Sequence, residues 1–487
     1  MTAKPIPKVS ASPSKYADGD GITASERIYR CAVLFVLLFA LAHVVSLPMV
    51  ITYDGLEYTD MAQILGSNRF PHDWYTNRTP LFPLALKVSL WMFGGQPLAP
   101  IVLGSTVGVI GILALGSVVR RMAGALAAAA CVVLVSLSPT LVTYEHAVLT
   151  EAGSFCLLML ICRIAFQDPQ NERGLWFRAA LLALTFAAGY YWRQTILSLT
   201  PAVAGVLFWR EWAAGRLQER RHTVAALGRI AVIVFIPILT AQPWARYVQT
   251  SGLRDVSLRQ GMIRQALLPP EDPFVGNNAE FYMQAIRDSI RNGNYYSGMT
   301  WDRLTLVSER VFARPLPDGT PRFFLYLIRR YPSRYLNGLG RTLLLFAGVK
   351  GVESDNRAFR SDLLGRHESE FKIGPAPDRL RELVEKQYRN STPSFPGSLL
   401  RWAAPLYDRM LVWASLLTLM GLAVALWRRD LQLLLFCGLP LTYILGYAVI
   451  LVSIDRFMVP VYPMMISNLV VVPLALWRVA RKSGSPI

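Results

Sequence analysis

The sequence predicts an all-α protein that crosses a membrane many times. Hydrophobic residues make up 53% of the 487 residues and charged residues only 17%, which is too apolar for a soluble protein of this length. Apolar runs of about 20 residues, the length of a helix that crosses hydrocarbon, recur along the chain. Lys and Arg gather in short loops between these runs, as orientation signals do, so the net charge of +18 does not indicate nucleic-acid binding.

Ten apolar runs are long enough to be membrane spans. They cover 28–50, 98–118, 124–142, 149–166, 175–191, 194–210, 227–246, 401–427, 431–451 and 457–477. The first run is too long for a removable signal peptide, so we interpret it as a retained anchor behind a polar tail. Two more apolar segments, 81–94 and 334–348, are short or carry charges and are expected to be interfacial or re-entrant helices. The expected number of spans is therefore ten to thirteen.

The basic loops predict the orientation of the chain. Lys and Arg precede the first span, follow the last one, and occupy the loops 119–123, 167–175, 211–226 and 428–430. With ten spans all of these fall on one side, which we predict to be the cytoplasm. We expect four parts: a disordered cytoplasmic tail (1–27), an N-terminal transmembrane module (28–246), an extracytoplasmic loop region with interfacial helices (247–400) and C-terminal transmembrane helices (401–487).

Three carboxylates, Asp54, Glu57 and Asp60, follow the first span closely. A carboxylate at a bilayer boundary loses hydration, and this cost is usually tolerated only where the group has a function. Asp54 either caps the next helix or acts as a general base, since partial desolvation tunes a carboxylate toward proton abstraction. If this segment is helical, Glu57 and Asp60 share a face with Asp54. They then orient Asp54, bind acceptor hydroxyls, or are simply solvated.

A second polar group, Tyr144, Glu145, His146 and Glu151, lies in and beside a tight outer loop between two spans. Glu151 begins an apolar helix, where it is costly unless paired, although the helix dipole favours an acid at that end. His146 has no second His nearby, and the five cysteines form no CxxC. The spacing therefore predicts no metal site and no disulfide framework.

Arg78, Arg193 and Arg456 lie at outer ends of helices, against the trend of the other basic residues. Each either anchors the protein to lipid headgroups or uses its planar guanidinium to clamp a phosphate. Asp455 precedes Arg456 directly, and this pair is either a structural salt bridge or a means of presenting Arg456. We predict that the three arginines converge on one cavity.

Four short sequence boxes occur in a set order. They are Asp-x-x-Glu-Tyr at 54–58, Arg-x-Pro-Leu-Phe-Pro at 78–83, Leu-Ser-Pro followed by Leu-Thr-Glu-Ala within 137–152, and Asp-Arg-Phe-Met-x-Pro-x-Tyr-Pro at 455–463. In these boxes the chain resembles the GT-C glycosyltransferases. It is similar to bacterial members such as the protein O-mannosyltransferases and the lipid A aminoarabinose transferase. The resemblance covers about 30–245 and 400–480.

The resemblance implies a GT-C bundle that moves a sugar from a polyprenyl phosphate, with inversion at the anomeric carbon. The acceptor is an envelope glycan, lipid or protein at the outer face of a bacterial inner membrane. It implies that Asp54 is the catalytic base and that Glu151, or else Glu145, is a second acid. Arg78 and Arg456 are then donor-phosphate ligands, with Glu57, Tyr58, Tyr144, His146, Arg193 and Asp455 as further substrate contacts. No cofactor is required, and a divalent cation is not implied.

One departure and two alternatives accompany this interpretation. The family often has paired acids in its first loop, whereas Gly55 follows Asp54 here. A secondary transporter or flippase for a lipid-linked or anionic solute also uses charges inside a membrane, but it would carry inverted repeats and acids at mid-depth. A scaffolding subunit of an envelope-synthesis complex is the third alternative. A charged cluster near the outer surface would favour the transferase.

Overall fold

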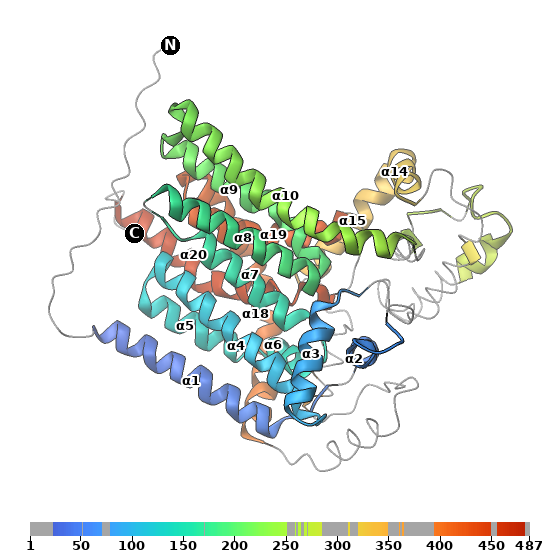
Figure 1. Cartoon of the computed structure of the whole chain (residues 1–487), viewed down its shortest axis with the longest axis horizontal. Coiled ribbons are helices and arrows are strands. Elements are labelled where there is room, and N and C mark those ends of the chain that lie inside the picture. The colour runs from blue at the N-terminus through green and yellow to red at the C-terminus, as the bar shows by residue number, and fades with distance from the viewer. Residues whose placement is uncertain are drawn as a thin grey trace.

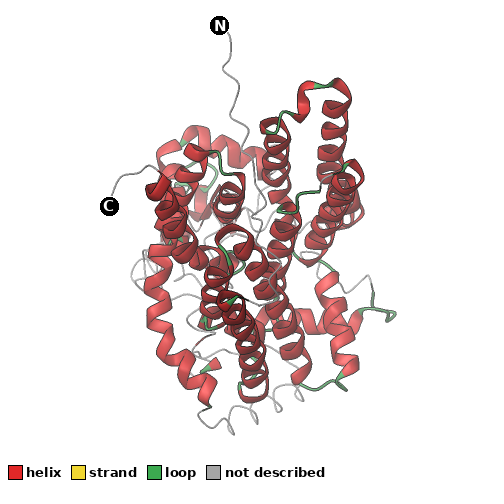
Figure 2. Ribbon diagram, turned by 90° about the vertical axis from the view of Figure 1, so that its left-hand side faces the viewer, coloured by secondary structure: helices red, strands yellow, loops and turns green. Residues whose placement is uncertain are grey.

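The computed structural model describes residues 23–50, 52–70, 78–169, 171–250, 320–348, 394–449 and 455–482, and short pieces between 259 and 364. Within these residues every regular element is a helix, as Figure 2 shows. The helices are α1 (Ala24–Ser46), α2 (Tyr53–Ile64), α3 (Leu81–Met92), α4 (Leu98–Ala123), α5 (Ala125–Ser136), α6 (Pro139–His146), α7 (Glu151–Ala165), α8 (Glu172–Trp192), η1 (Gln194–Leu199), α9 (Thr200–Ala213), η2 (Arg216–Gln218), α10 (Arg220–Thr250), η4 (Gly276–Asn278), α14 (Thr320–Arg330), α15 (Pro332–Phe346), α18 (Phe395–Arg428), α19 (Leu431–Val449), η5 (Asp455–Met458) and α20 (Tyr462–Lys482).

The long helices run side by side in one bundle (Figure 1). Helix α4 packs against α5 and α7, α8 packs against α10, and α18 packs against α19 and α20. Close approach depends on small residues: a Cβ on Gly111 of α4 would lie 2.7 Å from the ring of Phe155 in α7. Each of the ten apolar runs predicted as a span contains a helix of this bundle, so the predicted all-α membrane fold is confirmed.

Length and composition identify six of the described helices as able to cross a membrane: α1, α4, α10, α18, α19 and α20. Helices α5 and α6 are bent by 57° at Ser138–Pro139 and together add a seventh crossing if they form one broken span. Helices α7 and α9 are shorter, and α8 carries charges in its first turns. The expected ten to thirteen spans therefore require these shorter or charged helices to cross as well.

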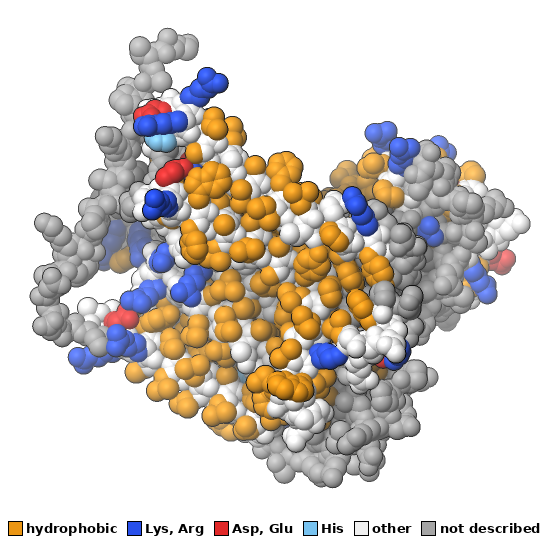
Figure 3. Space-filling view, viewed as in Figure 1, with side chains coloured by type: hydrophobic (Ala, Val, Ile, Leu, Met, Phe, Trp, Pro, Cys, Tyr) orange, Lys and Arg blue, Asp and Glu red, His pale blue; other side chains and the backbone are white. Residues whose placement is uncertain are grey.

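The outer surface of the bundle is a broad apolar band, as Figure 3 shows. Large side chains such as Leu41 of α1 and Trp427 of α18 are exposed there. Polar side chains exposed in this way would be hydrated by water. Large apolar side chains exposed on so many helices instead indicate a surface that contacts lipid. The bundle is therefore a polytopic membrane domain.

Two of the loops predicted to be cytoplasmic, 119–123 and the loop after α7, lie at the same end of this bundle as the described terminal segments. Arg120 pairs with Glu26 at 2.9 Å, and Arg478 donates to the carbonyl oxygens of Met122 and Ala123 at 2.7 and 3.0 Å. The loop after α7 joins them, because Arg121 donates to the Phe166 carbonyl at 3.4 Å. Chain segments from both termini and from interior loops therefore share one end, as the positive-inside pattern requires.

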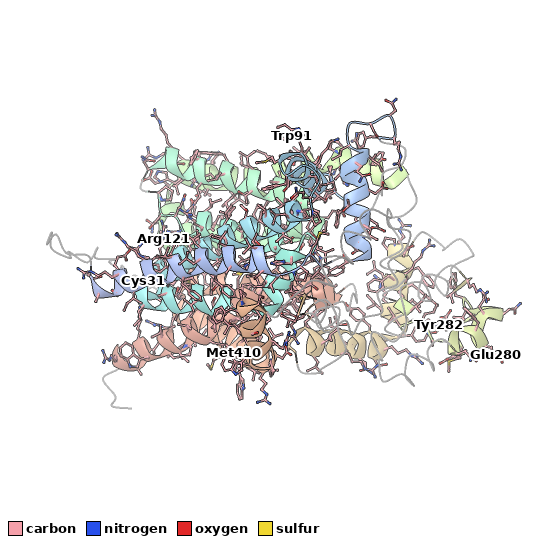
Figure 4. The ribbon with its side chains drawn as sticks, turned by 90° about the horizontal axis from the view of Figure 1, so that it is seen from below. Cys31, Trp91, Arg121, Glu280, Tyr282 and Met410 are labelled. Carbon is pink, nitrogen blue, oxygen red and sulfur yellow. The ribbon has the colours of Figure 1, made fainter. Side chains whose placement is uncertain are left out.

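The described part of the predicted loop region lies toward the other end. In Figure 4, Glu280 and Tyr282 are at the opposite end of the molecule from Cys31 and Arg121. This region has an apolar cluster of its own, made of Met262, Ile263, Leu267, Leu268, Val275, Tyr282, Val311, Phe323, Phe324 and Leu327. The expected helix at 334–348 is α15, whose Tyr335 hydroxyl donates to the Val449 carbonyl of α19 at 3.1 Å. Much of 247–400 lies outside the described residues.

Candidate functional site

Helix α2 brings its acids together on one side of a single arginine. Asp54, Glu57 and Tyr58 fall on one face because they are spaced three and four residues apart. Arg78 Nη2 lies 2.7 Å from Asp54 Oδ1 and 2.6 Å from Glu57 Oε2, and Arg78 Nε donates to the same Glu57 oxygen at 2.9 Å. The guanidinium also lies over the Tyr58 ring, 5.1 Å from its centre. Arg78 is therefore held by protein carboxylates and is not a simple headgroup anchor.

The capping alternative for Asp54 is not realised. Thr52 is the N-cap residue of α2, and its hydroxyl accepts from the Gly55 N–H at 2.9 Å. The Asp54 carboxylate is consequently available to Arg78. The pKa of the Arg78 guanidinium is raised: burial by itself would lower it, but Tyr58, Asp54 and Glu57 outweigh that effect.

A second ion pair joins the start of α7 to the end of α8. Arg193 Nη1 lies 2.8 Å from Glu151 Oε1, and the same nitrogen donates to the Thr150 hydroxyl at 3.0 Å. Arg193 Nε donates to the Tyr447 hydroxyl at 3.3 Å, and the guanidinium lies 4.7 Å from the centre of the Phe457 ring. Arg193 thus contacts aromatic side chains of α19 and η5, and it is not a lipid-facing anchor for headgroups.

Glu151 is almost fully buried, with a side-chain exposure of 2%. The N-cap residue of α7, Thr150, makes no side-chain cap bond, and Glu151 pairs with Arg193. Its second oxygen, Oε2, is buried without a hydrogen-bond partner among the described residues. A buried carboxylate oxygen is expected to be hydrogen-bonded, so this oxygen is an acceptor available to a bound hydroxyl or proton donor.

Aromatic side chains connect the two ion pairs. The Tyr58 and Phe82 rings meet edge to face at 4.8 Å, and Phe82 meets Trp192 in the same way at 5.2 Å. Trp192 Nε1 donates to the Thr150 carbonyl at 2.9 Å. Gly153 permits this approach, because a Cβ there would lie 2.1 Å from the Trp192 ring. The start of α7, the end of α8 and the α2–α3 segment are thereby fixed relative to one another.

The ring contacts from Tyr58 through Phe82 to Trp192 place both ion pairs in one region of the molecule. The pKa of the Tyr58 phenol is raised, chiefly by burial; Arg78 and Arg193 act to lower it, while Asp54 and Glu151 act to raise it. All four charged groups therefore lie close enough to affect one phenol. Together with Glu57 they form what we call the acid–arginine cluster: three carboxylates and two guanidiniums.

Three of the predicted site residues lie away from this cluster. Tyr144, Glu145 and His146 are buried in α6. Glu145 faces His43 of α1, and His146 contacts His43 and the Pro48 carbonyl. Asp60 is more exposed and lies 3.7 Å from Arg69. These positions favour a supporting role for Glu145 and His146 over the expected direct roles in catalysis and substrate binding.

The late sequence box lies beside the cluster. The backbone of η5 begins at Asp455, and its Phe457 ring contacts Arg193. The side chains of Asp455 and Arg456 lie outside the described residues, so the convergence of the three arginines on one cavity stays a prediction.

Sequence reasoning missed His43, Thr150 and Tyr447. His43 is a polar residue deep inside the first apolar run, and this was the only signal available. Tyr447 reaches Arg193 across 254 sequence positions, and its hydroxyl also donates to Thr195 at 3.0 Å. No local pattern marks such a long-range contact.

The structure also explains Gly55, the departure from the paired acids of the family. A Cβ at this position would lie 3.2 Å from both the Cβ and the carbonyl oxygen of Val148. A larger side chain would push α2 away from the segment that leads into α7. Glu57, one turn further along, supplies the second carboxylate on Arg78.

Comparison with known families supports the resemblance. Residues 77–240, about a third of the chain, match the family model of dolichyl-phosphate-mannose-protein mannosyltransferases. The match includes Arg78, Glu151 and Arg193, whereas Asp54 and the late box fall outside it. The comparison with curated proteins gave no match.

Two solved structures are similar to this chain, with low sequence identity and low TM-scores. The oligosaccharyltransferase AglB of Archaeoglobus fulgidus, in complex with an inhibitory peptide and a dolichol-phosphate, is 10% identical, with a TM-score of 0.42 over 94% of this chain and 52% of AglB. This chain thus spans about half the length of AglB. ArnT of Cupriavidus metallidurans is 13% identical in the apo state, with a TM-score of 0.36 over 92% of this chain and 78% of ArnT.

These structural similarities are too low to support an argument. The family match, which rests on sequence, covers two of the four boxes from which the resemblance was inferred. It confirms the resemblance: the chain is a polytopic helical membrane protein similar to the protein mannosyltransferases of the GT-C type.

Proposed function

We propose that this protein is an integral membrane glycosyltransferase. It moves a sugar from a polyprenyl phosphate to an envelope glycan, lipid or protein at the extracytoplasmic face of a bacterial inner membrane. The observation that carries the proposal is the acid–arginine cluster, in which Asp54 and Glu151 lie with Arg78 and Arg193 around one phenol. The description of the matching family names a polyprenyl-phosphate sugar, dolichyl phosphate mannose, which supports this class of donor.

The two arginines suit a phosphate that becomes a leaving group. Guanidinium groups bind phosphate oxygens in pairs, and charge that develops on the leaving oxygen is stabilised by groups already in place. Arg78 Nη2 is shared between Asp54 and Glu57. A donor phosphate competes with Asp54 for this nitrogen, so donor binding frees the Asp54 carboxylate.

In the proposed reaction Asp54 is the general base. The acceptor hydroxyl gives its proton to Asp54, and its oxygen forms a bond to the anomeric carbon. The bond from that carbon to the phosphate oxygen breaks, and polyprenyl phosphate leaves with the electron pair. The transition state is oxocarbenium-like, and a single displacement inverts the anomeric carbon. Glu151 Oε2, which lacks a partner among the described residues, is the site where an acceptor hydroxyl would be oriented.

The family match favours a transferase over a transporter, because the matching model describes mannosyltransferases. Asp54 begins α2, Glu151 begins α7 and Arg193 directly follows α8, so the charges lie at helix ends. The depth of these ends in the bilayer separates the two functions: a cluster at the outer leaflet supports the transferase, and a cluster at mid-depth supports a transport pathway.

The decisive variant is Asp54→Asn, which keeps the size of the side chain and removes its basicity. We expect transfer of labelled sugar from polyprenyl phosphate by purified protein in nanodiscs to fall about 100-fold or more. The matched control is Asp60→Asn on the same helix, whose side chain is 36% exposed and faces Arg69. Near wild-type turnover by Asp54→Asn would end the assignment of the base and make Glu151 the next candidate.

The orientation of the site is a separate prediction. A cysteine introduced at exposed Glu280 is expected to react with an impermeant maleimide in intact cells, whereas one at Gly215 is expected to react only after lysis. Parent protein without the new cysteine gives the background from the native thiols. Protection of position 280 in intact cells would place the site on the cytoplasmic side and contradict the proposed location.

A further inference from the structure

A buried chain of hydrogen-bonding groups joins α1, α6 and the segment that leads into α2. Glu145 Oε2 lies 3.2 Å from His43 Nε2. On the other side of this ring, His43 Nδ1 lies 2.9 Å from His146 Nε2. His146 Nδ1 lies 3.0 Å from the carbonyl oxygen of Pro48. All three side chains are at most 3% exposed, and they come from α1 and α6, which are 103 positions apart at the two His residues.

The protons of this chain can be counted. A carbonyl oxygen only accepts, so His146 Nδ1 carries a hydrogen. One hydrogen lies between the two rings. His43 Nε2 and Glu145 Oε2 are buried and 3.2 Å apart, which is within hydrogen-bond distance, so we place a third hydrogen between them. Two neutral imidazoles and a carboxylate together hold two such hydrogens and have a net charge of −1. With a third hydrogen, the Glu145–His43–His146 chain has a net charge of zero. In the arrangement without separated charge, the Glu145 acid donates to His43, His43 donates to His146, and His146 donates to Pro48.

The surroundings favour the arrangement without separated charge. Among the described residues, His43 is the single ion-pair partner found for Glu145. Helix α4 covers the carboxyl group closely, because a Cβ on Gly108 would lie 2.0 Å from Glu145 Oε1. Phe39 packs edge to face on the His43 ring at 5.5 Å. Separated charges in such a dry place are costly, whereas neutral hydrogen-bonded groups are not.

The chain ends on the segment that leads into α2. His146 contacts the Pro48 carbonyl through its ring and accepts from the Val50 N–H through its own carbonyl oxygen at 3.0 Å. Val50 forms a parallel bridge with Ala147. Two residues after Val50, Thr52 caps the helix that carries Asp54. The start of α2 is therefore fixed from α6.

We propose that Glu145, His43 and His146 form an uncharged, three-proton hydrogen-bond chain that positions residues 48–52 and thereby the Asp54 carboxylate. These are positioning residues, because they act through the backbone of α2 and do not contact Arg78. The effect on rate rests on the proposed transferase function. The protonation state of Glu145 and the structural order at the start of α2 do not depend on that function.

Infrared spectroscopy of the whole protein tests the protonation state. At neutral pH the wild-type protein minus Glu145→Gln spectrum should contain the carbonyl band of a protonated carboxylic acid. A carboxylate band in its place would overturn the uncharged arrangement. This measurement needs no substrate, so its result does not depend on whether the protein has the proposed transferase activity.

Substitutions test the positioning role. A glutamine amide can donate to His43 as the acid does, so Glu145→Gln should keep transfer within about threefold of wild type. Glu145→Leu and His146→Phe should lower kcat about 10- to 100-fold, because a small displacement of Asp54 is enough, while KM for the donor changes little. Equal losses in Glu145→Gln and Glu145→Leu would overturn the proposal.

A glycine pair supplies a variant that changes no titratable group. Gly108→Ala should displace Glu145 and raise amide hydrogen exchange over Val50–Leu56, whereas Gly205→Ala on α9 meets no atom within 4 Å and should leave it unchanged. Unaltered exchange in both Gly108→Ala and His146→Phe would show that the chain does not hold this segment. If exchange rises but no transfer is found in the wild type, the proposed function fails and the positioning chain stands.

Discussion

Helices α7 and α8 run in opposite directions, so each end of this pair combines the start of one helix with the end of the other. Glu151 and Arg193 meet at one end, within the acid–arginine cluster. At the other end, Arg229 pairs with Glu172 at the start of α8 and with Glu211 of α9, and Arg178 approaches Glu211 at 3.9 Å. Both ends bury charge in a membrane protein, yet their pairing differs.

At the far end, the described guanidiniums and carboxylates are equal in number. Arg178 also donates to the Gln167 carbonyl at 2.8 Å, and Arg210 combines an ion pair to Asp168 at 2.7 Å with bonds to backbone carbonyls after α7. Three guanidiniums face three carboxylates there. Arg229 Nε has no partner among the described residues, but both of its terminal nitrogens are paired. Such an arrangement fastens α8, α9 and α10 together and neutralises their ends.

The site end differs among the described side chains. Three described carboxylates face two described guanidiniums, Arg78 is shared between two acids, and Glu151 Oε2 has no partner among the described residues. Buried charge alone therefore does not identify a site in this molecule. The buried Glu151 oxygen, which can accept a hydrogen bond from a bound group, distinguishes the site end from an end that holds helices together.

The largest effect on stability is expected at the far end. Glu211→Gln would leave Arg178 and Arg229 buried without a carboxylate between them, which costs about 3–5 kcal/mol. Thermal unfolding in detergent should show a clearly lower Tm. Glu219→Gln is the matched control, because its pair with Arg221 is exposed and contributes little. Equal Tm values for both variants would remove the structural role of the far cluster.

The largest effect on chemistry is expected at the site end. Arg193→Lys keeps the charge but loses the fork that reaches both Glu151 and Tyr447. Transfer should fall about 100-fold, the usual cost of removing one donor that stabilises developing charge, with Tm nearly unchanged. Arg210→Lys at the far end should leave transfer close to wild type. Full activity of Arg193→Lys would show that Arg193 serves packing and not the donor phosphate.

The smallest effect is expected from removal of divalent cations. The proposed leaving group is stabilised by guanidiniums, so no metal is required for charge neutralisation. Transfer by the purified protein should therefore be unchanged, within error, after treatment with EDTA and after re-addition of Mg²⁺ or Mn²⁺. Loss of transfer with EDTA and recovery with a cation would assign the excess carboxylates of the site to a metal instead.

Local sequence predicted much of the fold. The ten apolar runs, the interfacial segment at 81–94 and the helix that carries Asp54 and Glu57 all correspond to helices. These features follow from periods and lengths of a few to about 20 residues. The convergence of Arg78, Arg193 and Arg456 on one cavity stays a prediction, although ring contacts through Tyr58, Phe82 and Trp192 connect the first two of these arginines.

Contacts between distant segments were not predictable in this way. Glu145 and Glu151 looked equivalent in sequence, yet Glu151 faces Arg193 and Glu145 faces His43. Glu145 lies near the end of α6, whereas Glu151 begins α7, so the two acids belong to different helices. A sequence shows that an acid is present near a helix end but does not show which neighbouring helix it meets.

The sequence by itself determined that this chain is a helical membrane protein, where its helices lie and which charged residues are unusual, because hydrocarbon imposes a length and a polarity on every segment that crosses it. The tertiary structure decided which carboxylates share an arginine, which one keeps a buried oxygen without a described partner, and which one belongs to the His43 chain. The physical reason is that burial and pairing depend on the packing of whole helices, since only packing brings Arg193 to Tyr447 across 254 positions.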